Sequence, residues 1–347
     1  MKLFALEPDF FSGHLNGARI PIFLMILQEL KQGRDVHALR GRQRFAVTLE
    51  QWPASMDEAY IVLRRTPVDT PASYEEMVTQ KGHAPHPGAL ENLDIASRSL
   101  LLNDSQARQA VNQLYELLSG RFGFDRFRLA APLRIVQGLR RDRAMLRRYD
   151  RVYVQTEPER HFLQRPLIGG DPDRIGIFNN MSVTLELFPR RKLPEQGDKA
   201  LRAGCFLLAV PPGRQRLGEY RWFLRRLARE PELLNRTTVL GPPALRDLLP
   251  REVAFVSEVP EIDSFFSEFA CVLVPTRHYT GMNNRVFQAA LAGCDIICSR
   301  EAVQGLNNAP SVRARCCNSF ADYAHAMASY PAGGVYLTPA DILGTER

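Results

Sequence analysis

Apolar and polar positions alternate along the chain in blocks that predict strands and helices in turn. Near the start, the apolar run 2–6 is followed by a polar, glycine-containing loop, the amphipathic segment 19–33 and a second apolar run at 35–39. Strand, loop, helix and strand in this order form a βαβ unit, which builds a parallel sheet. Further strands are predicted at 59–65, 99–103 and 151–156. These blocks indicate one complete α/β domain in the first half of the chain.

The alternation stops and then restarts in the second half. Residues 186–204 are mostly polar and charged, and they are predicted to be a linker. Strands and helices then alternate again, from the apolar run 205–210 to the run 295–299. At 347 residues, the chain is also longer than one typical core supports. The sequence therefore predicts an α/β protein of two Rossmann-like, doubly wound domains, 1–185 and 205–347, which face each other across a ligand-binding cleft.

Composition narrows the class of protein. Hydrophobic content of 45% and charged content of 24% are ordinary for a globular protein and exclude a disordered or fibrous one. The longest apolar run, 20–27, is too short to span a bilayer, and the first residues include acids where a signal peptide would be apolar. The six cysteines lack the spacing of a metal site and indicate buried thiols in a reducing compartment. We expect a cytoplasmic protein without a transmembrane segment or a bound metal.

The formal net charge of +7 permits a polyanionic partner without requiring one. Of the 45 basic residues, only five are lysines, and arginine is favoured where a planar, bidentate contact with phosphate matters. The cluster at 138–151 could follow a nucleic-acid backbone or make a peripheral contact with an anionic membrane. The alternative for this cluster is the solvated face of a helix.

The stretch VPTRHYTGMNNRVFQAALAGCDIICS, residues 274–299, contains the strongest candidate for chemistry. A strand delivers a loop rich in hydrogen-bonding groups, and a short helix starts at about Asn283. A helix start presents free N–H groups and the positive end of the helix dipole, which suits a phosphate. Arg285 adds a forked cation, and the amide of Gln288 lies on the same helix face, where it could hold sugar hydroxyls. The alternative is a solvated loop whose helix only packs on the sheet.

Residues 281–306 resemble the motif of GT-B glycosyltransferases of the broad group-1 class, particularly its spore-maturation-protein-like branch. The family pattern N-x-R-x-[FW]-E-A-x-A-x-G, followed by a strand and a Gly-Leu turn, contacts the nucleotide sugar. The resemblance implies that Asn284 and Arg285 hold the donor's diphosphate and that Gln288 holds the ribose or the sugar. It also implies contacts from Tyr279 and Asn283. Gln288 stands where the family has glutamate, so it can hydrogen-bond to hydroxyls but cannot balance a positive charge.

A second segment, AVPPGRQRLGEY, places Gly213, Arg214 and Arg216 directly after the first strand of the second domain. In the family, basic residues at this place grip the diphosphate. Fixed cations suit this task because the leaving nucleoside diphosphate gains charge as the glycosidic bond breaks. The alternative is an ordinary charged loop. Glu258 and Val259 fall where the family holds the nucleobase through backbone contacts.

An inverting transfer also needs a carboxylate that takes the proton of the acceptor hydroxyl. Asp104 follows a predicted strand end. It lies near the place where phage DNA β-glucosyltransferases, GT-B enzymes whose R-V-W-E helix resembles the stretch RVFQ here, carry their base. The alternative for Asp104 is the N-cap of the following helix. In the first loop, Glu7, Asp9 and His14 are further candidates for the base. A retaining transfer would need no dedicated base.

The sequence therefore predicts a glycosyltransferase that moves a sugar from a nucleoside diphosphate sugar, UDP-linked by expectation, to an acceptor hydroxyl. Gly13 of the first loop completes the predicted donor-binding set, and no cofactor beyond the donor is expected. The acceptor is a hydroxymethylated pyrimidine in DNA, or a glycan or lipid-linked intermediate. Two other classes stay open. One is a degenerate, non-catalytic GT-B subunit, and the other is an ATP-grasp ligase, which the stretches VLRRTPVD and LLLNDSQARQAVNQLY resemble.

Overall fold

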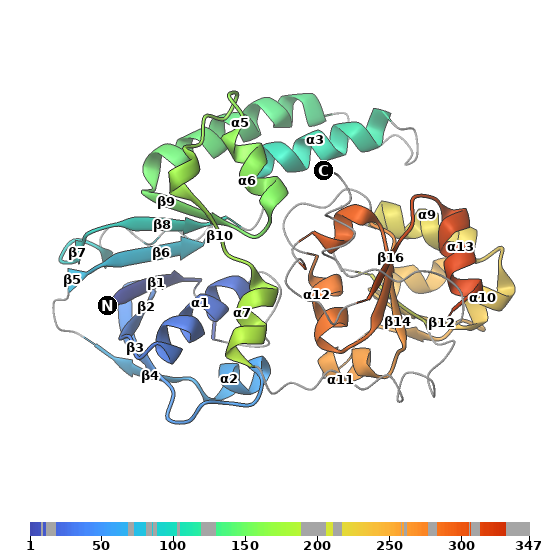
Figure 1. Ribbon diagram of the computed structural model, residues 1–347, viewed down its shortest axis with the longest axis horizontal. Coiled ribbons are helices and arrows are strands. Elements are labelled where there is room, and N and C mark those ends of the chain that lie inside the picture. The colour runs from blue at the N-terminus through green and yellow to red at the C-terminus, as the bar shows by residue number, and fades with distance from the viewer. Residues whose placement is uncertain are drawn as a thin grey trace. The chain divides into compact units, whose positions relative to one another are not determined.

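The computed structural model describes most of the chain and divides it into two compact units. The described residues are 1–7, 10–11, 19–68, 73–80, 85, 89–102, 105–118, 130–188, 206–210, 217–257, 259, 262–276, 283–304, 306 and 313–330. The N-terminal unit comprises Met1–Val111 and Pro132–Arg191, and the C-terminal unit comprises Asn112–Ala131 and Lys192–Arg347 (Figure 1). The predicted linker, 186–204, lies largely outside the described residues, and its first two residues complete a helix.

An eight-stranded sheet forms the centre of the N-terminal unit, in the order β10-β9-β8-β6-β1-β2-β3-β4. All neighbours are parallel except the β2-β3 and β3-β4 pairs. The strands are β1 (Lys2–Leu6), β2 (Val36–Arg40), β3 (Gln43–Thr48), β4 (Arg64–Pro67), β6 (Glu76–Gln80), β8 (Arg98–Leu101), β9 (Arg151–Val154) and β10 (Ile175–Ile177). A separate parallel pair is formed by β5 (Ser73–Tyr74) and β7 (Asp94–Ile95).

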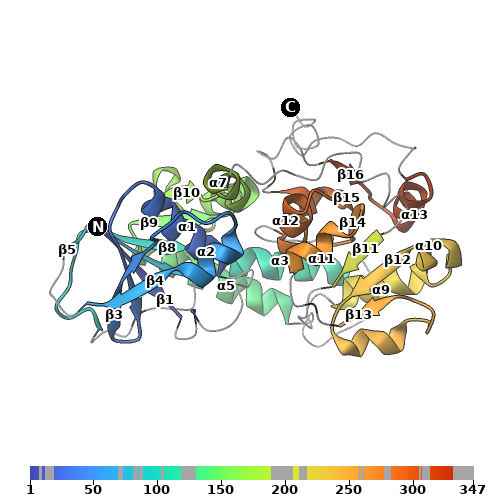
Figure 2. The same cartoon turned by 90° about the horizontal axis from the view of Figure 1, so that it is seen from below.

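Helices link these strands. They are α1 (Ile20–Lys31), α2 (Met56–Val62), α3 (Gln106–Leu118), α5 (Ala131–Arg148), α6 (Glu157–Gln164), the 3-10 helix η2 (Pro172–Arg174) and α7 (Asn180–Leu187). The apolar run 20–27 is buried along its whole length in α1, which packs against α7, as Figure 2 also shows. This run is apolar because a helix inside the unit contacts protein on every side. Among the described residues, no helix is both long and apolar enough to cross a bilayer.

The strand predicted at 59–65 is wrong over most of its length, because residues 59–62 belong to α2. The backbone N–H of Glu58 donates to Ser55 Oγ at 3.2 Å, and Glu58 Oε2 accepts from the backbone N–H of Ala54 at 2.7 Å. This cap satisfies N–H groups that the helix start would otherwise leave unpaired. The apolar side chain of Ile61 is 80% exposed as a result. The capping signal at Ser55 therefore outweighs the strand preference of the apolar run.

Replacing Gly138 with alanine is expected to lower the free energy of unfolding of the N-terminal unit by up to about 2 kcal/mol. A Cβ atom here would lie 2.6 Å from the backbone nitrogen of Ala107, so α5 would have to move away from α3. Overpacking of this kind costs about 1–3 kcal/mol, against a gain in helix propensity of about 1 kcal/mol. Urea denaturation followed by Trp52 fluorescence, with Trp222 replaced by phenylalanine, measures the change.

The control for this prediction is Ala144→Gly, at an exposed position of the same helix. It should cost about 1 kcal/mol through propensity alone. Stabilisation by Gly138→Ala would show that α3 and α5 do not approach as closely as the structure has them.

A six-stranded, fully parallel sheet forms the centre of the C-terminal unit, in the order β13-β12-β11-β14-β15-β16. The strands are β11 (Phe206–Ala209), β12 (Thr237–Leu240), β13 (Phe255–Val256), β14 (Cys271–Val274), β15 (Asp295–Cys298) and β16 (Ala314–Cys316). In chain order this is 3-2-1-4-5-6, the arrangement of the Rossmann fold. The predicted α/β class with two Rossmann-like sheets is confirmed.

Helices cover both faces of this second sheet (Figures 1 and 2). On one face, α9 (Leu217–Leu227), α10 (Pro231–Asn235) and α13 (Phe320–Ala328) pack against one another. On the other face, α11 (Ile262–Ser267) packs against α12 (Asn284–Leu291). The 3-10 helices η3 (Pro243–Leu248) and η4 (Arg300–Val303) complete the connections. The central strands β11, β14 and β15 are buried on both sides, which explains their nearly continuous apolar sequences.

Candidate functional site

The candidate site lies where the winding of the second sheet reverses. From β11 the chain winds outwards to β12 and β13, then returns to β14 on the other side of β11. Strands β11 and β14 are parallel and in register, with Phe206 beside Cys271 and Leu208 beside Leu273. Their carboxyl ends are therefore adjacent, and both predicted donor-binding segments start from these two ends. Open α/β sheets bind ligands at this kind of switch point.

Asn283 begins α12 as its N-cap. Its side-chain oxygen accepts a hydrogen bond from the backbone N–H of Arg285 at 3.0 Å, and the residue is buried. The helix start agrees with the one predicted at about Asn283, but this capping role was not predicted. The signal was an asparagine directly before an amphipathic stretch, which is a preferred N-cap. Asn283 thus fixes the orientation of the first turn, which carries the positive end of the helix dipole.

Arg285 and Gln288 form a hydrogen-bonded pair on α12. Arg285 Nη1 donates to Gln288 Oε1 at 2.8 Å, and both residues are half-buried. The amide is neutral, so it orients the guanidinium without cancelling its charge. A glutamate at 288, as in the family motif, would form an ion pair with Arg285 instead. The pair therefore keeps a formal positive charge beside the helix start, which suits an anionic ligand.

The body of α12 is held firmly on the sheet. Its inner face buries Val286, Phe287 and Leu291. Beyond the helix, Gly293 adopts a left-handed φ of 71°, and the thiol of Cys294 donates to the carbonyls of Phe266 at 3.1 Å and Phe269 at 3.3 Å. This packing and these hydrogen bonds restrict the motion of the helix start relative to the strand ends.

Buried polar side chains tie the strand ends together beneath the site. Ser299 Oγ donates to the carbonyl of Thr276, and Thr276 Oγ1 donates to the hydroxyl of Tyr220 at 3.2 Å. Tyr323 donates to the carbonyl of Val274 at 3.0 Å, and burial raises the pKa of its hydroxyl well above the usual value. Tyr323 therefore stays a donor at physiological pH. Sequence reasoning missed this network, because a single serine or threonine after a strand gives no sign of its partner.

Several predicted site residues lie outside the described ranges. They are Asp9, Gly13, His14, Asp104, Gly213, Arg214, Arg216, Glu258 and Tyr279. Of the others, Asn283, Asn284, Arg285 and Gln288 lie together at the start of α12, and half-buried Val259 follows β13. The roles that the resemblance implies for all of these residues stay predictions.

The structure removes one alternative for Asp104. The N-cap of α3 is Ser105, whose Oγ accepts from the backbone N–H of Arg108 at 3.1 Å and donates to Asp142 Oδ2 at 2.7 Å. Asp142 and Glu159 are both buried, and Glu159 Oε1 accepts from the backbone N–H of Ser105 at 3.2 Å. Asp104 is therefore not needed as the cap. In the sequence, Asp104 comes three residues after the end of β8.

The first loop begins at the switch point of the N-terminal sheet, where β1 lies between β2 and β6. Glu7, at the end of β1, forms an ion pair with the buried Arg19, with Oε1 2.8 Å from Nε. This ion pair gives Glu7 a structural role, and Asp9 and His14 stay as the loop's candidates for the base. Within the described ranges, no group of three or more histidine, cysteine, aspartate or glutamate side chains could hold a metal ion.

Comparison with known proteins shows a likeness of fold. No protein-family model and no curated protein matches the sequence. HepE of Anabaena in complex with UDP aligns with a TM-score of 0.53 and 12% identity, over 95% of this chain and 89% of that chain. HepE with UDP and glucose aligns with a TM-score of 0.50 and 12% identity, over 95% and 90%. A glycosyltransferase from Rickettsia africae aligns with a TM-score of 0.49 and 8% identity, over 94% and 86%.

The likeness to HepE extends over nearly the whole of both chains and confirms the GT-B fold. Two doubly wound, largely parallel sheets in series are not the architecture of an ATP-grasp ligase. That alternative, which rested on two short stretches, is therefore overturned.

Proposed function

We propose that the protein is a glycosyltransferase that moves a sugar from a nucleoside diphosphate sugar to an acceptor hydroxyl. The observation that carries this proposal is the switch point of the second sheet. There, a capped helix start and the charged Arg285, oriented by Gln288, follow β14, whose carboxyl end is adjacent to that of β11. The GT-B fold supports the same function.

A UDP-linked sugar is the proposed donor, since the similar protein HepE binds UDP. The first turn of α12, Arg285 and Asn284 would hold the diphosphate together with Arg214 and Arg216, because these groups combine free N–H donors with fixed cations. Gln288 would contact the ribose or the sugar. Tyr279 and Asn283 would add contacts, Gly213 and Gly13 would allow close approach of the backbone, and Glu258 and Val259 would hold the base.

For an inverting transfer, Asp104 is the proposed base. It would take the proton of the acceptor hydroxyl as that oxygen attacks the sugar carbon and the nucleoside diphosphate leaves. Asp9 and His14 are the alternatives. The anomeric configuration of the product relative to the donor, determined by NMR, tests this step, because retention would make a dedicated base unnecessary.

The proposed acceptor is a hydroxyl of a glycan or a lipid-linked intermediate. The resemblance to phage DNA β-glucosyltransferases supplies the other candidate, a hydroxymethylated pyrimidine in DNA. The salt dependence of acceptor binding distinguishes these two candidates. Binding to DNA releases counterions and weakens steeply as salt rises, whereas binding to a neutral glycan changes little.

Thermal stabilisation by UDP, GDP, ADP and ATP with magnesium tests the donor site. A ligand at 100 times its dissociation constant adds about 2.7 kcal/mol to the stability of the protein. We expect UDP to stabilise the protein most. Stabilisation by ATP alone, or by none of the four, would contradict the proposal.

Gln288 favours a second candidate function, a GT-B subunit that binds a sugar nucleotide without turning it over. The family glutamate is absent at this position. Such a subunit would gain stability from UDP-glucose but would release no UDP from it, with or without acceptors. A coupled assay for UDP distinguishes it from an active transferase.

A further inference from the structure

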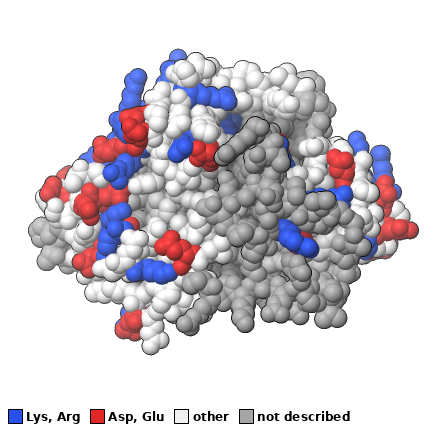
Figure 3. Space-filling model, in the orientation of Figure 1, with Lys and Arg blue, Asp and Glu red and all other residues white. Residues whose placement is uncertain are grey.

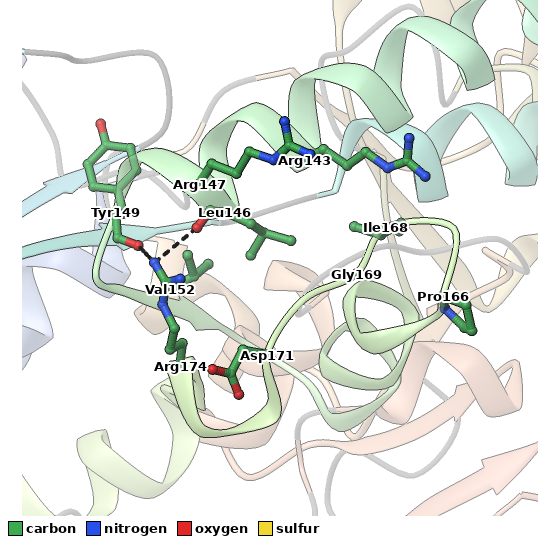
Figure 4. Close-up of a pocket in the computed structure, with 10 residues that line it drawn as sticks. All are labelled: Arg143, Leu146, Arg147, Tyr149, Val152, Pro166, Ile168, Gly169, Asp171 and Arg174. Carbon is green, nitrogen blue, oxygen red and sulfur yellow. Dashed lines mark hydrogen bonds between the residues drawn. The ribbon is translucent and has the colours of Figure 1, made fainter.

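A cavity of about 380 Å³ lies in the N-terminal unit, away from the strand ends that start the candidate loops. The second half of α5 forms one wall, and the segment between α6 and β10 forms the other (Figure 4). Three arginines and one acid are among its lining residues, namely Arg143, Arg147, Arg174 and Asp171. The cavity is therefore basic.

The cavity does not lie where a Rossmann-like sheet would bind a sugar donor. Tyr149 and Arg174, which line it, come just before β9 and β10, and these two strands run parallel. The cavity thus lies at the amino-terminal edge of the sheet. Ligand sites of Rossmann-like sheets lie at the carboxyl edge, so this basic cavity needs another explanation.

The side chain of Arg174 is fixed by the protein itself. It donates from Nε to the carbonyl of Asp150 at 3.0 Å, and from Nη2 to the carbonyls of Leu146 at 3.1 Å and Tyr149. These bonds satisfy carbonyls in the last turn of α5 and directly after it. Asp171 Oδ1 accepts from the backbone N–H of Asp173 at 3.0 Å. Arg174 is thus a structural cation on one side of the cavity.

Arg143 and Arg147 are different, because both are exposed and neither has a hydrogen-bond or ion-pair partner among the described residues. They are four residues apart, so they lie on one side of α5, and Figure 4 shows both side chains along this wall of the cavity. Like charges at this spacing repel each other, and an anion between them would relieve the repulsion. Guanidinium groups bind phosphate in a bidentate manner.

The opposite wall is rigid. The backbone N–H groups of Ile168 and Gly169 each donate to the carbonyl of Arg165 at 2.8 Å, and Gly169 has a φ of 74°. Gly170 is tightly enclosed, since a Cβ there would lie 2.7 Å from the carbonyl oxygen of Leu163. The cavity is therefore formed before any ligand arrives, which reduces the entropic cost of binding.

Apolar side chains surround this basic region. Leu167, beside the cavity-lining Pro166, is 66% exposed. On α5, helical spacing aligns the exposed Leu133 and Val136 with Arg143 and Arg147 in one stripe. In Figure 3, basic side chains gather over the top of the view, where Figure 1 places α5. Exposed apolar groups next to unpaired arginines fit a membrane interface better than a soluble phosphate.

We propose that this cavity binds the phosphate group of an anionic phospholipid, so that α5 lies along the surface of an anionic bilayer. Arg143 and Arg147 hold the phosphate oxygens, and Leu133, Val136 and Leu167 contact the acyl boundary. The inference does not depend on the donor site of the C-terminal unit, and it gives the basic cluster of the sequence a specific role.

Co-sedimentation of the whole protein with lipid vesicles tests the proposal. The probes are vesicles of phosphatidylglycerol with phosphatidylcholine, and vesicles of phosphatidylcholine alone. We expect binding to the anionic vesicles only, and about 30-fold weaker binding by the Arg143→Gln/Arg147→Gln variant. The matched control is Arg225→Gln/Arg229→Gln, which removes the same charge from exposed positions at the end of α9 and beyond. This control should bind within about threefold of the wild type.

Three results would overturn the proposal. Equal losses in both double variants would show attraction by overall charge only. Binding to duplex DNA without binding to anionic vesicles would identify a nucleic-acid surface. Thermal stabilisation by inorganic phosphate, lost in Arg143→Gln/Arg147→Gln and unaccompanied by vesicle binding, would identify a site for a soluble anion. Unchanged thermal unfolding of the variants without ligand confirms that they are folded.

Discussion

Replacing Arg285 with alanine is expected to weaken the binding of UDP by about 10- to 100-fold and to leave folding nearly unchanged. The guanidinium is half-buried at the start of α12, and Gln288 holds it through a neutral amide at 2.8 Å. This amide partner does not offset the positive charge of the guanidinium, which suits a diphosphate. A hydrogen bond to a charged group contributes about 1.5–3 kcal/mol, which corresponds to this loss of affinity. Isothermal titration calorimetry with UDP measures it.

Two further variants make the result specific. Arg285→Lys keeps the charge but loses the forked geometry, so we expect an intermediate affinity. Arg225→Ala removes an exposed arginine from the last turn of α9 and should bind UDP as the wild type does. Full UDP affinity in Arg285→Ala would place the donor elsewhere. A similar loss in all three variants would mean that net charge alone governs binding.

Replacing Arg313 with methionine is expected to destabilise the C-terminal unit by about 3–5 kcal/mol. Arg313 forms an ion pair with the fully buried Asp295 through Nε at 3.0 Å and through Nη2. Tyr330 donates to the same carboxylate at 3.1 Å. Methionine preserves much of the apolar volume but leaves the buried carboxylate without this cation, and an uncompensated buried charge costs about this much. Urea denaturation followed by Trp222 fluorescence in a Trp52→Phe background measures the change.

The two members of this ion pair differ in burial, since the side chain of Arg313 is 38% exposed and that of Asp295 is fully buried. Asp295→Asn leaves an arginine that water can reach, so its cost should be smaller. Combining both changes should recover part of the loss caused by Arg313→Met alone. The control Arg315→Met removes a partly buried arginine that donates to Ser329 Oγ at 3.1 Å, and it should cost about 1 kcal/mol. If Arg313→Met loses less stability than the control Arg315→Met, the ion pair with Arg313 does not stabilise the buried carboxylate of Asp295.

The order of elements could be predicted from the sequence because it depends on local patterns. Apolar runs flanked by turn residues gave half of the strands of the N-terminal sheet and most strands of the C-terminal sheet. The run at 59–65 failed because a cap at Ser55 made most of it helical. The start of α12 was also readable, since an asparagine before an amphipathic stretch needs no distant partner. These features follow from interactions between residues close together in the chain.

Other features of the candidate site depend on contacts between distant segments. The sequence suggested Asp104 as the cap of α3, whereas the cap is Ser105, which is held by Asp142 and Glu159 far along the chain. Nor did it show that Thr276 and Ser299 would meet beneath the site. Each of these side chains is ordinary in its local context, and only its partner gives it a role.

The sequence by itself determined a chain of two α/β units with a phosphate-suited helix start near Asn283, since apolar periodicity and capping are local properties. Only the tertiary structure decided that β11 and β14 are neighbours, that Gln288 orients Arg285, and that α5 and the segment before β10 enclose a basic cavity. The physical reason is the same in each case. Strand pairing and cavities come from packing between elements far apart in the sequence, and the orientation of Arg285 comes from its geometry in the folded helix, so composition and periodicity constrain these features only weakly.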